Sequence, residues 1–135
     1  MASIYREILI NARPEDVWAV VRNVGAAQYL VPGIIIDARL EEDTRILTFA
    51  DGTVYHELII DVNDDTRRVA YASIGGRTRH HNASMQVFAD GADRSRLIWI
   101  TDVAPNEFAA SISKLMDQNS AVIKQTLEER KGRIS

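Results

Sequence analysis

The 135-residue sequence predicts an α+β fold in which one curved antiparallel β-sheet wraps around a long C-terminal helix. Two observations lead to this fold class. Between residues 33 and 103, strand-like segments follow one another and are separated by turn dipeptides such as Asp51-Gly52 and Asp90-Gly91. From Pro105 to about Lys131 the chain has no internal helix breaker, and its apolar residues recur at three- and four-residue steps, which is typical of an amphipathic helix.

The N-terminal part supplies one strand and two helical pieces. Residues 3–10, "SIYREILI", mix β-branched and aromatic residues and are expected to form a strand. Pro14 then begins the predicted helix "PEDVWAVVRNV", because proline suits the first helical position and Glu15 and Asp16 favour the positive end of the helix dipole. A second short helical piece, "GAAQYL", ends at the "VPG" of residues 31–33.

Six further strands are expected from the segments "GIIIDARLEED", "TRILTFADG", "TVYHELIIDVNDD", "TRRVAYASIGG", "HHNASMQVFADG" and "SRLIWITDV". At about 1.5 Å per residue the C-terminal helix is roughly 40 Å long. A helix of that length in so small a protein needs a long partner surface, and the concave face of a strongly curved sheet supplies one. The predicted architecture is therefore β-α-α-β6-α, in a single domain over residues 1–135.

Composition narrows the function classes. The hydrophobic and charged fractions, 46% and 26%, are ordinary for a globular domain, and the net charge of −3 argues against nucleic acid as a partner. No apolar run reaches the roughly 18–20 residues of a membrane span, and the N-terminus does not resemble a secretory signal, so a cytoplasmic location is expected. The chain has no cysteine, which excludes disulfides, cysteine nucleophiles and thiolate metal sites.

Several residue patterns carry a family resemblance. The segment "RILTFADGTVYHELIIDVNDDTRRVAYAS" (45–73) resembles START-like (SRPBCC) proteins of the polyketide cyclase/dehydrase type. The segments "ARPEDVWAVV" (12–21) and "SRLIWITDVAP" (95–105) extend the resemblance over nearly the whole chain. It implies a helix-grip fold with a cavity between sheet and helix for a small, largely apolar molecule, although this fold hosts many functions. The residues that match the pattern are Arg45, Gly52, Glu57, Asp64, Asp65, Arg67, Arg68, Tyr71 and Trp99.

Glu57 is the first candidate for chemistry, and two arguments conflict over where it points. Side chains alternate along a strand, so Tyr55, Glu57 and Ile59 share one face. Periodicity favours burial of the opposite face, which carries Leu58 and Ile60, and that would turn Glu57 outward. The resemblance implies that the glutamate faces the cavity. We follow the resemblance, because Tyr55 and Ile59 make this face apolar as well.

An inward Glu57 is a carboxylate in a poorly solvated pocket, so it needs either a raised pKa or a cationic partner. Arg45 on the neighbouring strand is the candidate partner. Two interpretations follow. In the first, the pair anchors a ligand or takes part in general acid–base catalysis. In the second, Glu57 has no role in function and is either one half of a buried structural ion pair or an exposed surface carboxylate.

The adjacent histidines of "TRHHNAS" (78–84) are candidates for a metal site. Neighbouring strand residues point to opposite faces, and the apolar residues at 83, 85 and 87 share the parity of His81, so we expect His81 inward and His80 outward. If Glu57 is inward, His56 is outward, and no metal site is expected. His81 is either a proton-transfer or hydrogen-bonding group in the pocket or an ordinary half-buried histidine.

The remaining candidates come from positions expected to face the cavity or its mouth. Trp99 and Tyr71 are either pocket residues or plain core, and the helix stripe that ends at Asn119 has this residue as its only polar member. Glu57 and His81 form the candidate catalytic pair. The predicted ligand-binding residues are Tyr29, Arg45, Phe49, Tyr55, Tyr71, Trp99, Phe108, Ile112, Met116 and Asn119.

The leading functional prediction is binding of a small hydrophobic or aromatic ligand, a class that includes lipid transport, without a cofactor. The alternative is a polyketide cyclase/aromatase or dehydratase-like enzyme that uses Glu57 and His81 as acid and base, with Arg45 stabilising an enolate. A second alternative is a protein-interaction module. We also predict a homodimer through an apolar patch on the convex face, because exposed patches mark partner surfaces; its residues are Leu58, Ile60, Ile98 and Ile100.

Overall fold

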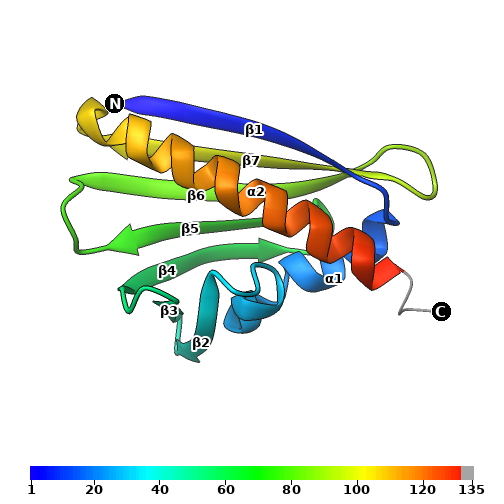
Figure 1. Cartoon of the computed structure of the whole chain (residues 1–135), viewed down its shortest axis with the longest axis horizontal. Helices are drawn as coiled ribbons and strands as arrows, with labels where there is room; N and C mark the ends of the chain where they lie inside the picture. Colours follow the sequence, from blue (N-terminus) through cyan, green and yellow to red (C-terminus); the bar gives the residue numbers. More distant parts are fainter. Residues whose placement is uncertain (132–135) are drawn as a thin grey trace.

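The computed structural model describes residues 1–131, and these contain one seven-stranded antiparallel sheet (Figure 1). The strand order across the sheet is β1-β7-β6-β5-β4-β3-β2, so the chain enters at one edge, crosses to the other and returns strand by strand. The predicted helix-grip fold class and order of elements are confirmed. The strands are β1 Ala2–Ile10, β2 Ile35–Glu41, β3 Thr44–Phe49, β4 Val54–Asn63, β5 Arg68–Ile74, β6 His80–Ala89 and β7 Ser95–Ala104.

The long helix α2 (Ala109–Lys131) follows a single 3-10 turn, η2 (Asn106–Phe108), and crosses the concave face beside β1 and β7 (Figure 1). At 23 residues it is about 35 Å long. Its inner stripe is buried against the sheet at Met116, Ile123 and Leu127. No helix among the described residues is long and apolar enough to cross a membrane.

An ion pair fixes the position of α2 on the edge strand. Arg6 of β1 donates through Nε to Asp117 Oδ1 at 2.6 Å and through Nη2 to Ser113 Oγ at 2.5 Å, and both acceptors lie on α2. Because Arg6 lies opposite Trp99 in the register of β1 and β7, these contacts are on the concave face. The helix is therefore held over one half of the sheet, which leaves the half formed by β2–β5 for other elements to cover.

The 3-10 helix η1 (Val24–Tyr29) packs against β2 and β3 in that other half, and the preceding helix α1 (Pro14–Val21) packs against β6 and β7. Trp18 Nε1 and Arg22 Nε each donate to Asp64 Oδ1 at 2.9 Å, which ties α1 to the turn between β4 and β5. The same contacts, that of Arg22 first, lower the pKa of Asp64. On η1, Gly25 lies so close to β2 that a Cβ there would be 3.0 Å from Leu40 Cδ1.

A β-bulge in β4 decides which side chains of this strand face the core. Glu57 lies opposite Ser73 on β5, but beyond the bulge the register shifts by one residue, at the position of Ile60. Ile59 before the bulge and Val62 after it both pack against the core, whereas Ile60 is exposed. The periodicity argument, which favoured burial of Leu58 and Ile60, is therefore wrong for both residues, and Glu57 faces the core as the family resemblance implied.

The predicted dimer patch is not one exposed surface. Ile98 is buried, with 8% of its surface exposed, because it lies on β7 between Glu7 of β1 and Gln86 of β6. Leu58 and Ile60 are exposed on β4, but two strands separate β4 from β7, a distance of roughly 14 Å at ~4.8 Å per strand. The predicted exposure of all four residues together is therefore wrong, because alternation along a strand does not show how its neighbours cover it, and the homodimer itself stays a prediction.

Candidate ligand-binding site

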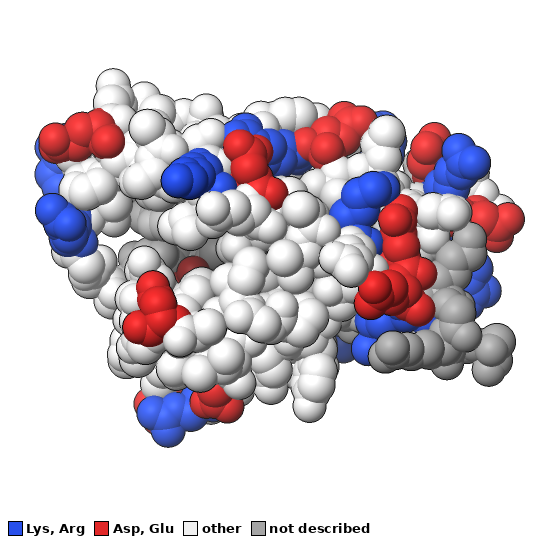
Figure 2. Space-filling view, in the orientation of Figure 1, with Lys and Arg blue, Asp and Glu red and all other residues white. Residues whose placement is uncertain are grey.

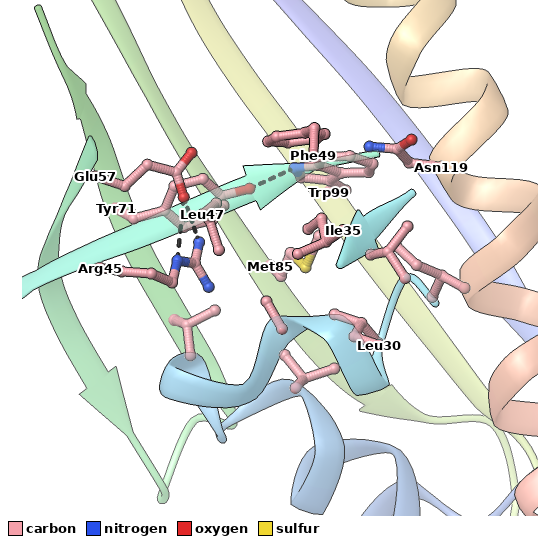
Figure 3. A pocket seen from close by; sticks show the side chains of 15 residues that line it. Leu30, Ile35, Arg45, Leu47, Phe49, Glu57, Tyr71, Met85, Trp99 and Asn119 are labelled. Atoms are coloured by element: carbon pink, nitrogen blue, oxygen red, sulfur yellow. Dashed lines mark hydrogen bonds and ion pairs between the residues drawn. The ribbon is translucent and has the colours of Figure 1, made fainter. Parts of the chain in front are cut away.

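A pocket of about 100 Å³ lies on the concave face, between the sheet, the segment around η1 and helix α2 (Figure 3). The space-filling view shows the same face hollowed below α2, with acidic atoms in the depth of the hollow (Figure 2). Most of the pocket wall is apolar. The lining residues are Val21, Ala27, Leu30, Val31, Ile35, Arg45, Leu47, Phe49, Glu57, Val69, Tyr71, Met85, Trp99, Asn119 and Ile123.

One wall of the pocket carries a buried ion pair. Arg45 of β3 lies directly opposite Glu57 of β4, and its Nη2 and Nε donate to Glu57 Oε1 at 2.6 and 3.1 Å. The two side chains are 10% and 12% exposed. Arg45 also donates through Nη1 to the carbonyl oxygen of Val24 at 3.3 Å, which links the pair to η1. The opposite charges cancel, so the pocket has no net charge.

Two aromatic residues continue this wall toward the helix. The guanidinium carbon of Arg45 lies 4.8 Å from the centre of the Tyr71 ring, within the range of a cation–π contact. Trp99 Nε1 donates to the Tyr71 hydroxyl at 3.2 Å (Figure 3). Burial raises the pKa of Tyr71, and the nearby Glu57 carboxylate raises it further, so the hydroxyl keeps its proton. Strand register thus places a polar chain of four side chains from β3 to β7.

Helix α2 contributes the uncharged polar group Asn119. The nitrogen end of its side-chain amide is turned toward the rings of Trp99 and Phe49, and the oxygen end is turned away from them (Figure 3). Its carbonyl oxygen Oδ1 is buried and has no hydrogen-bond partner among the described residues. A buried polar atom without a partner costs about 1–3 kcal/mol, so this amide is a feature that requires an explanation.

His81 lies in the same row of the sheet but outside the pocket lining. Glu57 is opposite Ser73, and continuing the β5–β6 register by one residue beyond Ala72–Asn82 places Ser73 opposite His81. His81 is half-buried, while His56 and His80 are exposed. Burial lowers the pKa of His81, the Glu57 carboxylate opposes this shift and His80 adds to it, so the imidazole is neutral near pH 7.

No group of three or more metal-ligating side chains comes together within residues 1–131. The histidines are spread by strand alternation, as described above for His56, His80 and His81. The described part of the chain therefore presents a neutral, largely apolar pocket with a few fixed polar groups, which is the general form of a small-molecule site.

The structure brings together half of the site predicted from sequence. The predicted residues that line the pocket are Arg45, Phe49, Glu57, Tyr71, Trp99 and Asn119. Tyr29 does not, because it points outward from η1 and is 62% exposed. Tyr55 lies at the rim, where its ring contacts that of Phe49 edge-on at 5.0 Å between centroids.

The beginning of α2 lies outside the pocket lining for a different reason. Met116 is buried in the core, and Ile112 is half-buried beside it. Phe108 is half-buried too, with the guanidinium carbon of Arg77 5.8 Å from its ring centre. Ile112 and Met116 share the inner stripe of α2 with Asn119, and Phe108 precedes them in η2; all three lie nearer the N-terminal end of the helix, where they pack rather than line the cavity.

The pocket residues missed by sequence reasoning are all apolar. Leu47, Val69 and Met85 share strand parity with Arg45, Tyr71 and His81, so alternation was a signal that could have found them. Leu30 and Val31 come from the connection after η1 and Ile35 is the first residue of β2, where no periodic pattern indicates a direction.

The arrangement of a curved sheet closed around a C-terminal helix, with a pocket between them, defines a helix-grip protein. The family described as polyketide cyclase/dehydrase and lipid transport matches residues 1–130, and the chain belongs to this family. No curated protein matches the chain in sequence.

Solved structures of similar fold come from several organisms. An uncharacterised protein from Bacillus thuringiensis has a TM-score of 0.85 at 17% identity and covers 93% of this chain and 98% of its own. The Zhui aromatase/cyclase from Streptomyces sp. R1128 has a TM-score of 0.78 at 16% identity, with 98% and 94% covered. Norcoclaurine synthase from Thalictrum flavum, in complex with dopamine and hydroxybenzaldehyde, has a TM-score of 0.74 at 20% identity, with 95% and 84% covered. At these identities the likeness extends to the fold alone.

Proposed function

We propose that this protein binds a small hydrophobic or aromatic molecule in the pocket between the sheet and α2. The observation that carries the proposal is the Arg45–Glu57 pair, buried at the wall of an otherwise apolar cavity. Replacing a buried ion pair by packed apolar side chains is often neutral or stabilising, so folding alone gives little reason for this pair. A pocket that must orient a ligand does give a reason.

The volume of the pocket limits the ligand. About 100 Å³ is somewhat less than the roughly 150 Å³ of a cavity that binds benzene, and well below the ~300–1,000 Å³ of sites for drug-sized molecules. A molecule with one ring is therefore the size class that fits, with slight movement of the walls. A multi-ring polyketide needs a much wider opening between η1 and α2.

The comparisons support ligand binding as a role for this fold. The family description includes lipid transport, and the Thalictrum enzyme of similar fold holds dopamine and hydroxybenzaldehyde. These are properties of the family and of that enzyme. For this chain they favour a small-molecule ligand over a partner protein.

The test is a titration of the protein with toluene, followed through backbone amide chemical shifts. We expect saturable shifts that are largest around Leu30, Trp99 and Asn119. Leu30→Trp fills the pocket and should weaken binding at least tenfold, whereas Leu115→Trp, on the exposed side of α2, should leave it unchanged. Both variants are first checked for cooperative unfolding, since overpacking costs about 1–3 kcal/mol. Equal binding by the two variants would show that the pocket is not the site.

A second candidate function is enzymatic, and the row Glu57–Ser73–His81 favours it. Strands are ~4.8 Å apart, so a carboxylate and a neutral imidazole lie roughly 10 Å apart on one face, measured between backbones. A substrate that extends from the pocket toward His81 would meet both groups. His81 would then act as the base, and Glu57 with Arg45 would stabilise or protonate the developing enolate.

Turnover of a poly-β-keto substrate tests this candidate. Glu57→Gln and His81→Ala should each lower kcat by about 10²-fold or more, which is the lower range for loss of a general acid or base. His80→Ala, on the opposite face, serves as the matched control. Full activity in both Glu57→Gln and His81→Ala would remove these residues from the chemistry.

A further inference from the structure

The carboxylate of Glu57 uses only one of its two oxygens for bonds within residues 1–131. Both hydrogen bonds from Arg45 end on Oε1, and no described residue donates to Oε2. This second oxygen is turned away from Arg45 (Figure 3). Glu57 is not among the described residues that have a buried side-chain atom without a partner, so Oε2 is not sealed in the core. Because Glu57 lines the pocket, a molecule that enters the pocket meets a strong hydrogen-bond acceptor.

The hydroxyl of Tyr71 is a matching donor. Its oxygen accepts the indole N–H of Trp99, and no described residue accepts its own proton. Tyr71 lies two residues along β5 from Ser73, the residue opposite Glu57, so Tyr71 and Glu57 are diagonal neighbours on the concave face. Such neighbours lie about 7–8 Å apart, within reach of long and aromatic side chains. Arg45 contacts both of them, so a small polar group beside this pair is in reach of both.

A hydroxyl group is the group that completes the hydrogen bonds between these residues. It can donate its proton to Glu57 Oε2 and accept the proton of Tyr71, so every bond from Trp99 to Glu57 has one donor and one acceptor. An ammonium group cannot accept the Tyr71 proton, and an ether or a ketone cannot donate to Glu57. A carboxylate would lie beside the negative charge of Glu57, and like charges repel.

From these contacts we infer that the ligand is an uncharged single-ring molecule whose hydroxyl group bridges the Tyr71 hydroxyl and Glu57 Oε2. This inference rests on the proposed function and narrows it to a chemical class. The ring lies in the apolar part of the pocket, whose walls include Leu47 and Phe49. Asn119 takes no part in this bond, because the oxygen end of its amide is turned away from the rings (Figure 3). Glu57 and Tyr71 then distinguish hydroxylated rings from plain hydrocarbons.

Three probes of comparable size test this inference: phenol, which is uncharged at pH 7 and both donates and accepts; anisole, which only accepts; and toluene, which does neither. Their dissociation constants are measured for the wild type, for Glu57→Gln and for Glu7→Gln. In Glu57→Gln the amide oxygen keeps the contact with Arg45, so the NH₂ group takes the place of Oε2 and an acceptor becomes a donor. Glu7→Gln is the matched control, because Glu7 is paired with Arg96 on the convex face.

We expect the wild type to bind phenol roughly tenfold or more tightly than anisole, which is usual for a hydrogen bond to a charged group. This preference should disappear or reverse in Glu57→Gln and stay unchanged in Glu7→Gln. Equal binding of phenol and anisole by the wild type would overturn the inference, as would a preference that Glu57→Gln retains. Either result, with toluene still bound, leaves the proposed function intact. Failure of every probe to bind would refute the proposed function, and this inference with it.

A second readout uses the wild-type protein alone, in case Glu57→Gln does not unfold cooperatively. The side-chain carboxyl ¹³C resonance of Glu57 should move on saturation with phenol well beyond its movement with toluene or anisole. The resonance of Glu7 should stay in place with all three probes. Equal movement of the Glu57 resonance with phenol and toluene would overturn the inference without any variant.

Discussion

Each face of the sheet carries an arginine–glutamate pair between neighbouring strands, and the two pairs are in different surroundings. On the concave face Arg45 and Glu57 are 2.6 Å apart and 10% and 12% exposed. On the convex face Arg96 and Glu7 are 3.5 Å apart and 40% and 39% exposed. The residue types are the same, so the difference in exposure arises because the concave face is covered by other segments and the convex face is open to solvent.

This comparison shows that an ion pair affects the stability of the protein mainly where solvent is excluded. Water screens the Arg96–Glu7 pair, and such pairs contribute about 0–1 kcal/mol. The Arg45–Glu57 pair is shielded by η1 and the pocket walls, so removing one partner leaves an uncompensated buried charge. Tyrosine and histidine allow the same comparison, since Tyr71 and His81 lie on the concave face and Tyr5 and His80 on the convex face.

The largest expected difference is in the ion pairs. Glu57→Ala should lower the free energy of unfolding by about 3–5 kcal/mol, because the Arg45 guanidinium stays buried alone. Glu7→Ala should lower it by less than about 1 kcal/mol. Urea denaturation of both variants measures the two losses. Equal losses would mean that water reaches the concave pair as freely as the convex one.

The tyrosine substitutions should differ less in the free energy of unfolding that each one costs. Tyr71→Phe removes the acceptor of the Trp99 indole N–H, and a buried donor without a partner costs about 1–3 kcal/mol. Tyr5→Phe removes only an exposed contact, in which the Tyr5 hydroxyl donates to Glu7 Oε2 at 3.3 Å, and should change stability by less than about 0.5 kcal/mol. Thermal unfolding of the two variants at one pH provides the comparison. A loss in Tyr71→Phe as small as that in Tyr5→Phe would show that the indole finds another acceptor.

The smallest expected difference is between the two histidines, in how each contributes to the dependence of stability on pH. Burial lowers the pKa of His81 below its ordinary 6.5, so just below pH 6.5 the unfolded chain binds a proton that the folded chain does not. Stability is therefore complete above about pH 6.5 and falls as the pH decreases toward the folded-state pKa. Denaturation midpoints between pH 7.5 and 5.5 measure the slope. His81→Asn should flatten it, and His80→Asn, which keeps His81, should not; the opposite result would place the buried imidazole at residue 80.

Glu57 shows how far the sequence leads and where it stops. Alternation along β4 predicted two opposite orientations for this side chain, depending on which apolar residues were counted. The structure contradicts the count that buries Leu58 and Ile60, which are exposed, and the bulge at Ile60 brings only Val62 of that series to the core. A bulge is stabilised by the partner strand, so residues 54–63 alone do not reveal it.

The pocket itself shows a second limit. The long helix was evident from its periodicity, and Asn119 stood out as the polar member of its stripe. The selection of Asn119 over Met116 and Ile112 for the cavity depends on where η1 packs, and η1 is positioned by the contacts of Gly25 and Val24 with β2 and β3. Contacts between segments distant in sequence leave no periodic trace within either segment.

By itself the sequence determined the fold class, the order of the strands and helices along the chain, and the inward stripe of α2, because these follow from local turn chemistry, capping and hydrophobic periodicity. The tertiary structure alone decided between the two orientations of Glu57 and so buried its pair with Arg45 on the concave face, buried Ile98 on the convex face, and set the pocket volume at about 100 Å³. Those features depend on register, on strand order and on the close packing of separate segments, and each of these is a relation between parts of the chain that only folding brings together.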